Sequence, residues 1–262
     1  MRRFFLALFL VICTLPPAML KAQWMPEVLR TSPELNPNDS NKLILGVDMT
    51  GFFKNNEYFS PIAKGATFPG IRFSPSLKYQ LNDKLSAEVG LTGLYYSGDQ
   101  QKDGMEYFRW VHARMQYAPT PNLNIVLGNL YGGVSHRVIE PLYRWELQMT
   151  NKPESGIQII YEDKRFFADT WVNWRRYIER GDTIPEVLTF GISSSIKLSK
   201  PENRLQLSVP LQLLIYHEGG QIDRSESPMI VAGNIATGIN SELKLDGKFI
   251  QSVGLNKFTI KF

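Results

Sequence analysis

The sequence is poor in cysteine, in histidine and in long apolar runs. Its single cysteine, Cys13, excludes a disulfide framework and a zinc site built from cysteines. The longest uninterrupted apolar run, at residues 4–13, has ten residues, whereas a membrane-spanning helix needs about 20. A helical integral-membrane protein is therefore excluded. With 12% aromatic residues, 20 glycines and only 21% charged residues, the composition is also unlike that of a disordered chain.

Residues 1–22 have the layout of a secretory signal peptide. Arg2 and Arg3 supply a positive start, residues 4–15 supply an apolar core, and Ala22 precedes the expected cleavage point. This segment contains three of the 29 basic residues and no acidic one, so its removal leaves 26 basic against 25 acidic residues and lowers the net charge from +4 to +1. A near-neutral mature chain lacks the basic surface that nucleic-acid binding requires, and we expect no nucleic-acid partner.

Apolar and polar residues alternate along most of the remaining chain. Residues 23–42 are rich in Pro, Asn and Ser and are predicted to form a mobile N-terminal lead-in. From Leu43 to Phe262 the apolar residues recur with a period of two, as in residues 205–215, where every second residue from Leu205 to Ile215 is apolar. No stretch of comparable length has helical spacing. The pattern predicts an all-β protein, with the clearest strands at residues 68–81, 84–97, 105–119, 187–199, 203–217 and 229–245.

The length of these strands favours a membrane β-barrel over a soluble sandwich. Sandwich strands usually have five or six residues, whereas these candidates have about 10 to 15. Long strands with one apolar and one polar or small face are typical of an antiparallel transmembrane barrel at residues 43–262. A secreted β-sandwich is the alternative. Aromatic residues near both strand ends, such as Tyr95, Trp174, Tyr79 and Tyr117, favour the barrel because aromatic girdles mark both membrane interfaces.

The connections between the strands alternate between short and long. Short turns are predicted near residues 82–83, 120–122, 163–164, 200–202 and 246–247, and long loops at 55–67, 98–104, 132–154, 178–186 and 218–228. This alternation gives about 11 strands, an odd number, whereas single-chain bacterial barrels usually have an even number. Two explanations remain open: a larger barrel interrupted at Phe262, which we favour, or a twelfth strand within residues 139–150.

From Leu43 onward the chain resembles the bacterial outer-membrane porin-type β-barrels as a class, without a motif that specifies a subfamily. The resemblance implies a location in the outer membrane, contact with outer-membrane lipid, and passive or substrate-guided passage of small hydrophilic solutes. It implies neither an enzyme nor a cofactor or metal. The alternatives are an outer-membrane enzyme of the lipase or deacylase type and a structural barrel of a larger envelope assembly. The oligomeric state stays open.

If the apolar positions of each strand face outward, the residues between them face the inside of the barrel. The charged residues at these inward positions are the candidates for the pore lining. They are Asp48, Arg72, Lys78, Glu88, His112, Arg114, Asp169, Arg175, Lys197, Arg204, Glu242 and Lys244. Basic residues outnumber acidic ones on this face, which predicts a modest anion preference, because rings of fixed charge select ions by sign. The longest connection supplies the candidates for a constriction loop, which are His136, Arg137, Glu140 and Arg144.

Few residues are available for catalysis. Ser135 and His136 are adjacent, so on an extended chain their side chains point to opposite faces and cannot form a nucleophile–base pair. His217 and Glu218 lack the second histidine of a metalloprotease helix. A Ser/His/acid site assembled across strands stays open as the enzyme alternative, and replacement of His136 or His217 would test it. Trp171, Asn173 and Arg175 share one strand face, which fits either interfacial anchoring or contact with a sugar ring.

Overall fold

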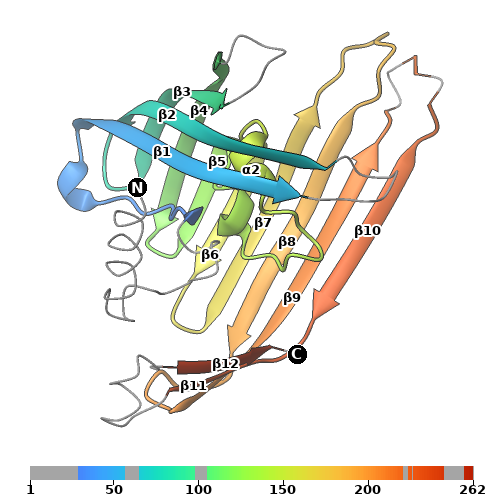
Figure 1. Ribbon diagram of the computed structural model, residues 1–262. Helices are drawn as coiled ribbons and strands as arrows, with labels where there is room; N and C mark the ends of the chain where they lie inside the picture. The colour runs from blue at the N-terminus through green and yellow to red at the C-terminus, as the bar shows by residue number, and fades with distance from the viewer. Residues whose placement is uncertain are drawn as a thin grey trace, which may run out of the picture.

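A single antiparallel sheet of 12 strands forms the body of the protein in a computed structural model (Figure 1). The structure describes residues 29–56, 65–97, 105–220, 224–225, 227–244 and 257–261. The predicted signal peptide lies outside these residues. No helix within the described ranges is long and apolar enough to cross a membrane. The predicted all-β, antiparallel fold of the barrel type is confirmed.

The strands follow one another in the sheet in chain order. They are β1 (Lys42–Asn56), β2 (Ala66–Gln80), β3 (Leu85–Tyr96), β4 (Met105–Thr120), β5 (Leu123–Asn129), β6 (Ser155–Glu162), β7 (Phe166–Arg176), β8 (Val187–Lys197), β9 (Leu205–Glu218), β10 (Ile230–Thr237), β11 (Asn240–Lys244) and β12 (Lys257–Lys261). Among the described residues β1 pairs only with β2, β10 only with β9 and β12 only with β11, so the strongly curved sheet is not closed (Figure 1).

The polarity of the two sheet faces is the reverse of that in a soluble sandwich. On the convex face large apolar side chains are exposed, for example Leu45 at 76% and Val111 at 79%. On the concave face polar side chains are buried, and Gln116 and Gln158 have almost no exposed surface. Lipid is the environment that favours exposed apolar residues around an entire wall. The alternation of outward apolar and inward polar residues therefore continues around the sheet. This arrangement excludes a secreted β-sandwich, whose apolar residues would be buried between two sheets.

The predicted strand at residues 229–245 is divided in two. β10 pairs with the second half of β9, from Leu211 to Glu218, and β11 with its first half, from Leu205 to Ser208. The interruption falls at residues 238–239, which lie outside both strands. Counted as one interrupted strand, β10 and β11 bring the number to the 11 expected from the turns. The alternative twelfth strand within residues 139–150 is wrong, since that segment contains turns and the short helix α2 (Leu147–Thr150).

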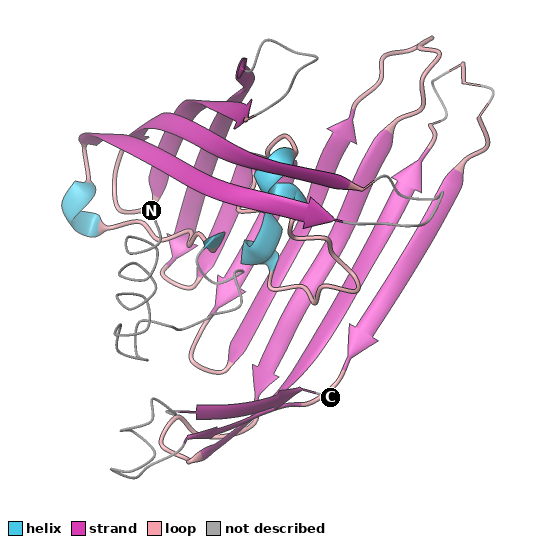
Figure 2. Cartoon of the chain, viewed as in Figure 1, coloured by secondary structure: helices cyan, strands magenta, loops and turns pink. Residues whose placement is uncertain are grey.

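Two irregular segments lie against the concave face of the sheet (Figure 2). One is residues 130–154, with the 3₁₀ helix η3 (Gly133–His136) and α2. The other is residues 29–41, which include the 3₁₀ helix η2 (Pro37–Asp39). Gln80 donates to the Asn36 carbonyl at 2.7 Å, and Gln116 donates to the Pro33 carbonyl. Hydrogen bonds therefore hold the described part of the lead-in inside the barrel wall, whereas the sequence predicted a mobile segment.

Candidate functional site

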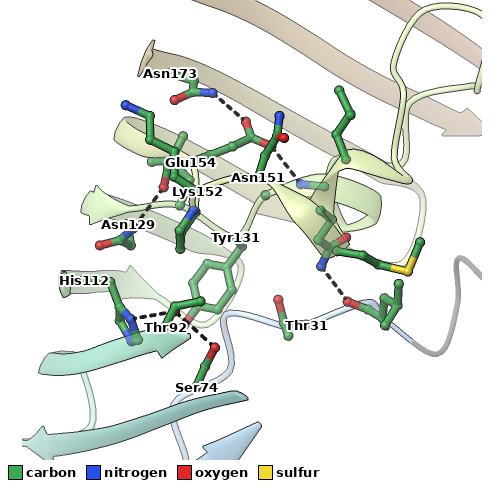
Figure 3. A pocket seen from close by; sticks show the side chains of 18 of the residues that line it. Thr31, Ser74, Thr92, His112, Asn129, Tyr131, Asn151, Lys152, Glu154 and Asn173 are labelled. Carbon is green, nitrogen blue, oxygen red and sulfur yellow. Dashed lines mark hydrogen bonds between the residues drawn. The ribbon is translucent and has the colours of Figure 1, made fainter. Parts of the chain in front are cut away.

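A cavity of about 1650 Å³ occupies the part of the lumen that the two irregular segments leave open (Figure 3). Strands β1 to β4 line one side of it and β7 to β9 line another, while residues 129–133 and 142–154 form part of its floor. A volume of this size can enclose the polar part of a large amphipathic ligand, because drug-sized pockets have about 300–1000 Å³. The chemistry of the site depends on which polar side chains face this space.

His112 on β4 is the cavity histidine with a hydroxyl and a carboxylate as neighbours. Its Nδ1 lies 3.4 Å from Thr92 Oγ1 (Figure 3), and its Nε2 lies 3.8 Å from the nearer carboxylate oxygen of Glu88. The Thr92 hydroxyl is also 3.1 Å from the hydroxyl of Ser74 on β2. A hydroxyl, an imidazole and a carboxylate in this order are the parts of an activated nucleophile, and such contacts are often longer in the absence of substrate.

Arg114 holds the carboxylate of this group in place. Its Nη1 donates to Glu88 Oε2 at 3.3 Å, and its Nε and Nη2 donate to the carbonyls of Asn129 and Leu130 at 2.7 and 3.1 Å. The guanidinium also stacks over the ring of Tyr131, 4.0 Å from its centroid. Glu88 therefore has a fixed position from which it can orient His112 and stabilise the imidazolium that forms when His112 accepts a proton.

Glycine provides the space in which the His112 ring lies. Gly90 is the direct cross-strand partner of His112, and a Cβ atom at Gly90 would be 2.3 Å from His112 Nε2. Glu88, Gly90 and Thr92 occupy alternate positions on one face of β3, so the small residue separates the carboxylate from the hydroxyl and admits the imidazole between them. A glycine makes space for a large ring in the same way on β8, where Gly191 is the cross-strand partner of Trp171 on β7.

Gly90→Ala is expected to displace the His112 ring without unfolding the sheet. The added methyl also lies 2.7 Å from the carbonyl of Pro75, so the ring and the neighbouring strand must shift together. We expect the rate of any reaction in which His112 acts as the base to fall by about 10²-fold, since displacement of a catalytic group by about 1 Å has this effect. Gly51→Ala is the matched control because its Cβ would have no neighbour within 4 Å. Equal activities of the two variants would contradict this view of the site.

His136 lies outside the cavity, in a buried group of polar side chains. Its Nδ1 is 2.7 Å from Asp169 Oδ2, its Nε2 is 3.3 Å from Glu154 Oε2, and its ring stacks on Trp171 with centroids 3.6 Å apart. Gln158 donates to both oxygens of Asp169 at 3.0 Å. Both ring nitrogens are occupied and the side chain is fully buried. His136 therefore has no free nitrogen with which to activate a substrate hydroxyl or water.

The same group fixes residues 130–154 against the barrel wall. Glu154 accepts hydrogen bonds from the backbone N–H of Gly133, from the Tyr143 hydroxyl and from Asn173, which lies on β7. Burial by itself lowers the pKa of His136, but the two carboxylates outweigh it and raise that pKa to about 9. Burial favours the neutral form of Glu154, but the His136 imidazolium and the hydrogen bonds lower its pKa to about 2.

We expect the stability of the protein to be highest between about pH 4.5 and 6.5. Since the pKa of His136 is raised from 6.5 to about 9, its contribution is complete below pH 6.5 and is lost as the pH rises through 9. Since the pKa of Glu154 is lowered from 4.5 to about 2, its contribution is complete above pH 4.5 and is lost as the pH falls towards 2. Urea unfolding in detergent at pH values from about 2 to about 9, with His136→Gln as control, measures the effect. An alkaline decrease of equal size in the variant would contradict it.

Half of the predicted pore-lining residues line this cavity. They are Asp48, Arg72, Glu88, His112, Arg114 and Arg175. Lys78 is the cross-strand partner of Glu88. Asp169 is buried against His136, and Lys197 lines a second cavity of about 400 Å³. Arg204, Glu242 and Lys244 lie near the β8–β9 turn, where Lys244 donates to the Pro201 carbonyl.

The predicted constriction-loop residues do not gather at one place. His136 is buried in the polar group described above. Arg137 forms a bidentate ion pair with Glu162 on β6 and, like Glu140, lines the second cavity. Of the four, Arg144 lines the main cavity. The four side chains therefore do not form one ring that would narrow a pore.

The other residues singled out in the sequence have structural contacts. Ser135 and His136 lie on the 3₁₀ helix η3 instead of an extended chain, and the Ser135 hydroxyl accepts from the Thr31 N–H at 3.0 Å. His217 Nε2 is 2.7 Å from the Gly219 carbonyl. Trp171 is buried beneath His136, which leaves no part of it for interfacial anchoring.

Sequence reasoning missed Thr92 and Ser74, although it placed Glu88 and His112 on the inner face. The available signal was the set Glu88, Gly90 and Thr92 at alternate positions of one strand, with a glycine where a large side chain on the next strand needs space. Alternation alone does not give the register between β3 and β4, and so it could not place His112 beside Thr92.

The fold and this site define an all-β protein of the outer-membrane barrel type whose lumen contains the elements of a hydrolase. A family model described as "Lipid A 3'-O-deacylase-type" matches residues 35–262. The chain belongs to the lipid A 3'-O-deacylase-type family. No curated protein matches it. Membership of a family named for lipid A and an all-β fold both agree with a location at the outer membrane.

The predicted porin-like channel is wrong, and so is the prediction that the protein is not an enzyme. The family match points to a deacylase, which was the alternative. The physical reason lies in the lumen, where buried polar side chains and the two irregular segments occupy part of the space that an open pore would need. The expected anion preference depended on the channel and is withdrawn with it. Charged side chains at the inward-facing positions are common to both classes of barrel, and therefore they do not distinguish a channel from an enzyme.

Proposed function

We propose that the protein is an exported outer-membrane hydrolase that removes an ester-linked acyl chain from lipid A or a closely related glycolipid. The hydroxyl–imidazole–carboxylate chain of Thr92, His112 and Glu88 in the lumenal cavity carries this proposal. The family match supplies the substrate class, and the signal-peptide pattern of residues 1–22 agrees with export. The exposed apolar wall would keep the enzyme in the membrane that contains its substrate.

In the proposed reaction Thr92 is the nucleophile and His112 is the general base. With its proton on Nε2, towards Glu88, the neutral imidazole accepts the Thr92 proton at Nδ1 while Thr92 Oγ1 bonds to the ester carbonyl carbon. The tetrahedral intermediate then breaks its bond to the sugar oxygen, which takes the proton from His112 and leaves as a free hydroxyl. Glu88 stabilises the transient imidazolium, and Ser74 holds the Thr92 hydroxyl in position.

Water completes the cycle. A water molecule transfers a proton to His112 Nδ1 and attacks the acyl-threonine ester, and the released Thr92 oxygen recovers the proton from the imidazolium. The sum is one ester and one water converted to one carboxylic acid and one hydroxyl, with the enzyme regenerated. Such general acid–base catalysis contributes about 10²- to 10⁴-fold to a rate.

Mass spectrometry of lipid A incubated with the purified protein tests this function. We expect the loss of a single acyl chain, with an equimolar amount of free fatty acid, in detergent that keeps the barrel folded. The matched control is His112→Gln purified in the same way, because it reveals any contaminating esterase. If the wild-type protein releases no more fatty acid than this variant from any acylated glycolipid tested, the proposed function is overturned.

A further inference from the structure

Three cationic side chains surround one short piece of chain at the edge of the cavity. Arg72 on β2 donates from Nη1 to the carbonyl of Asn151 at 2.7 Å, and Lys152, the next residue, donates from Nζ to the carbonyl of Arg175 on β7. All three cations line the main cavity. Residues 151–152 thus bring charges from two walls of the lumen to one place, where Arg72 and Lys152 are each held by a backbone carbonyl and the Arg175 guanidinium lies near enough to act on Lys152 electrostatically.

The carboxylates of the cavity neutralise these charges only in part. Seven basic residues line it, namely Arg30, Arg72, Arg114, Arg144, Lys152, Arg175 and Arg176, against the four acidic residues Asp48, Glu88, Glu154 and Glu218. Three of the acids have other partners, since Glu88 pairs with Arg114, Glu218 with Arg176, and Glu154 with His136. The fourth, Asp48, interacts electrostatically with Arg72. Within the described part of the chain, neither Lys152 nor Arg175 forms an ion pair with an acidic side chain.

Lys152 and Arg175 also repel each other. Burial, and after it the nearby Arg175 guanidinium, lower the pKa of Lys152 from its ordinary value. Like charges held together raise the free energy of the empty site, and an anion placed between them relieves this repulsion. A guanidinium presents a planar fork of donors that matches the oxygens of a phosphate, and an ammonium adds a compact charge.

We propose that Arg72, Lys152 and Arg175 form a subsite for a phosphate monoester on the sugar of the substrate. This inference rests on the proposed function and specifies which end of the glycolipid enters the lumen. Arg72 is two residues along β2 from Ser74, on the same face, which separates them by about 7 Å. Ser74 touches the proposed nucleophile Thr92. A phosphate bound there belongs to the sugar ring that carries the scissile ester, and it would hold that ester above Thr92.

Steady-state kinetics on two forms of one glycolipid test the subsite. We expect Lys152→Gln and Arg175→Gln each to raise KM for the phosphorylated glycolipid about tenfold with little change in kcat, because loss of one charged contact weakens binding by about this factor. On the same glycolipid treated with phosphatase, both variants should match the wild type. Lys164→Gln is the control, since Lys164 lies in the β6–β7 turn and does not line the cavity. Unchanged KM values on the phosphorylated form would overturn the inference while leaving deacylation intact.

Binding of inorganic [³²P]phosphate to the detergent-solubilised protein separates this inference from the proposed function. If the wild type does not deacylate, phosphate binding that requires both Lys152 and Arg175 still supports an anion subsite. Absence of such binding overturns it. If phosphate binds in this way but removal of the phosphate from the glycolipid leaves KM unchanged, the site takes free phosphate, and its assignment to the substrate is wrong.

Discussion

His112→Gln is expected to lower the deacylation rate by about 10²- to 10⁴-fold, the range that general acid–base catalysis contributes. The imidazole is the group within reach of both the Thr92 hydroxyl and the Glu88 carboxylate, and glutamine cannot accept and return a proton at neutral pH. Release of fatty acid from lipid A under saturating conditions measures the effect. KM should change little, since the imidazole acts on the proton and does not hold the substrate.

His217→Gln is the matched control for this prediction. It makes the same chemical change in a histidine at the end of β9, where the ring contacts the Gly219 carbonyl, and it should retain wild-type activity. A His112→Gln variant that is folded and hydrolyses lipid A at the wild-type rate would exclude His112 as the base. Activity lost in His217→Gln as well would indicate that the assay reports general damage to the barrel.

The role of Thr92 is tested within the same series. Thr92→Ser keeps a hydroxyl beside His112 and should retain activity, whereas Thr92→Val has a similar shape without the hydroxyl and should lose it to about the same extent as His112→Gln. Substantial activity in Thr92→Val would mean that water, activated by His112, attacks the ester directly.

His136→Ala is expected to destabilise the folded protein by about 3–5 kcal/mol. Removal of the imidazolium leaves Asp169 and Glu154 buried without their cationic partner, and breaking a buried pair in this way has a cost of about that size. The ring stacked on Trp171 is lost at the same time, and a space remains beneath η3. Urea-dependent unfolding in detergent micelles, followed by tryptophan fluorescence, gives the free energy of unfolding.

Two further variants isolate the charge in this prediction. Glu154→Gln keeps groups that can bond to Gly133 and Tyr143 but removes one buried carboxylate, so the double variant His136→Ala/Glu154→Gln should be more stable than His136→Ala alone. His217→Ala removes a partly exposed ring and should change stability by less than about 1 kcal/mol. If His136→Ala unfolds within about 1 kcal/mol of the wild type, the buried group does not stabilise residues 130–154.

The all-β class and the alternation of short and long connections could be predicted from the sequence, and export remains a prediction of the same kind. Each depends on a local pattern: a positive start followed by an apolar core, a period of two, or turn residues between runs. Glu88, His112 and Arg114 were assigned to the inner face on parity alone, and in the structure they line the cavity. The face on which a residue lies depends only on its position along its own strand, and for that reason the sequence was sufficient to assign it.

Other features required the tertiary structure, because they depend on register and on contacts between distant segments. The pairing of Gly90 with His112 places an imidazole between Thr92 and Glu88, and a shift of one residue in that pairing would turn the ring to the lipid side. The contact of His136 with Asp169 joins residues 33 positions apart. A period of two determined the wall of this protein, whereas strand register decided which side chains meet on the inner face and the folding of distant segments decided which of them the lumen leaves open.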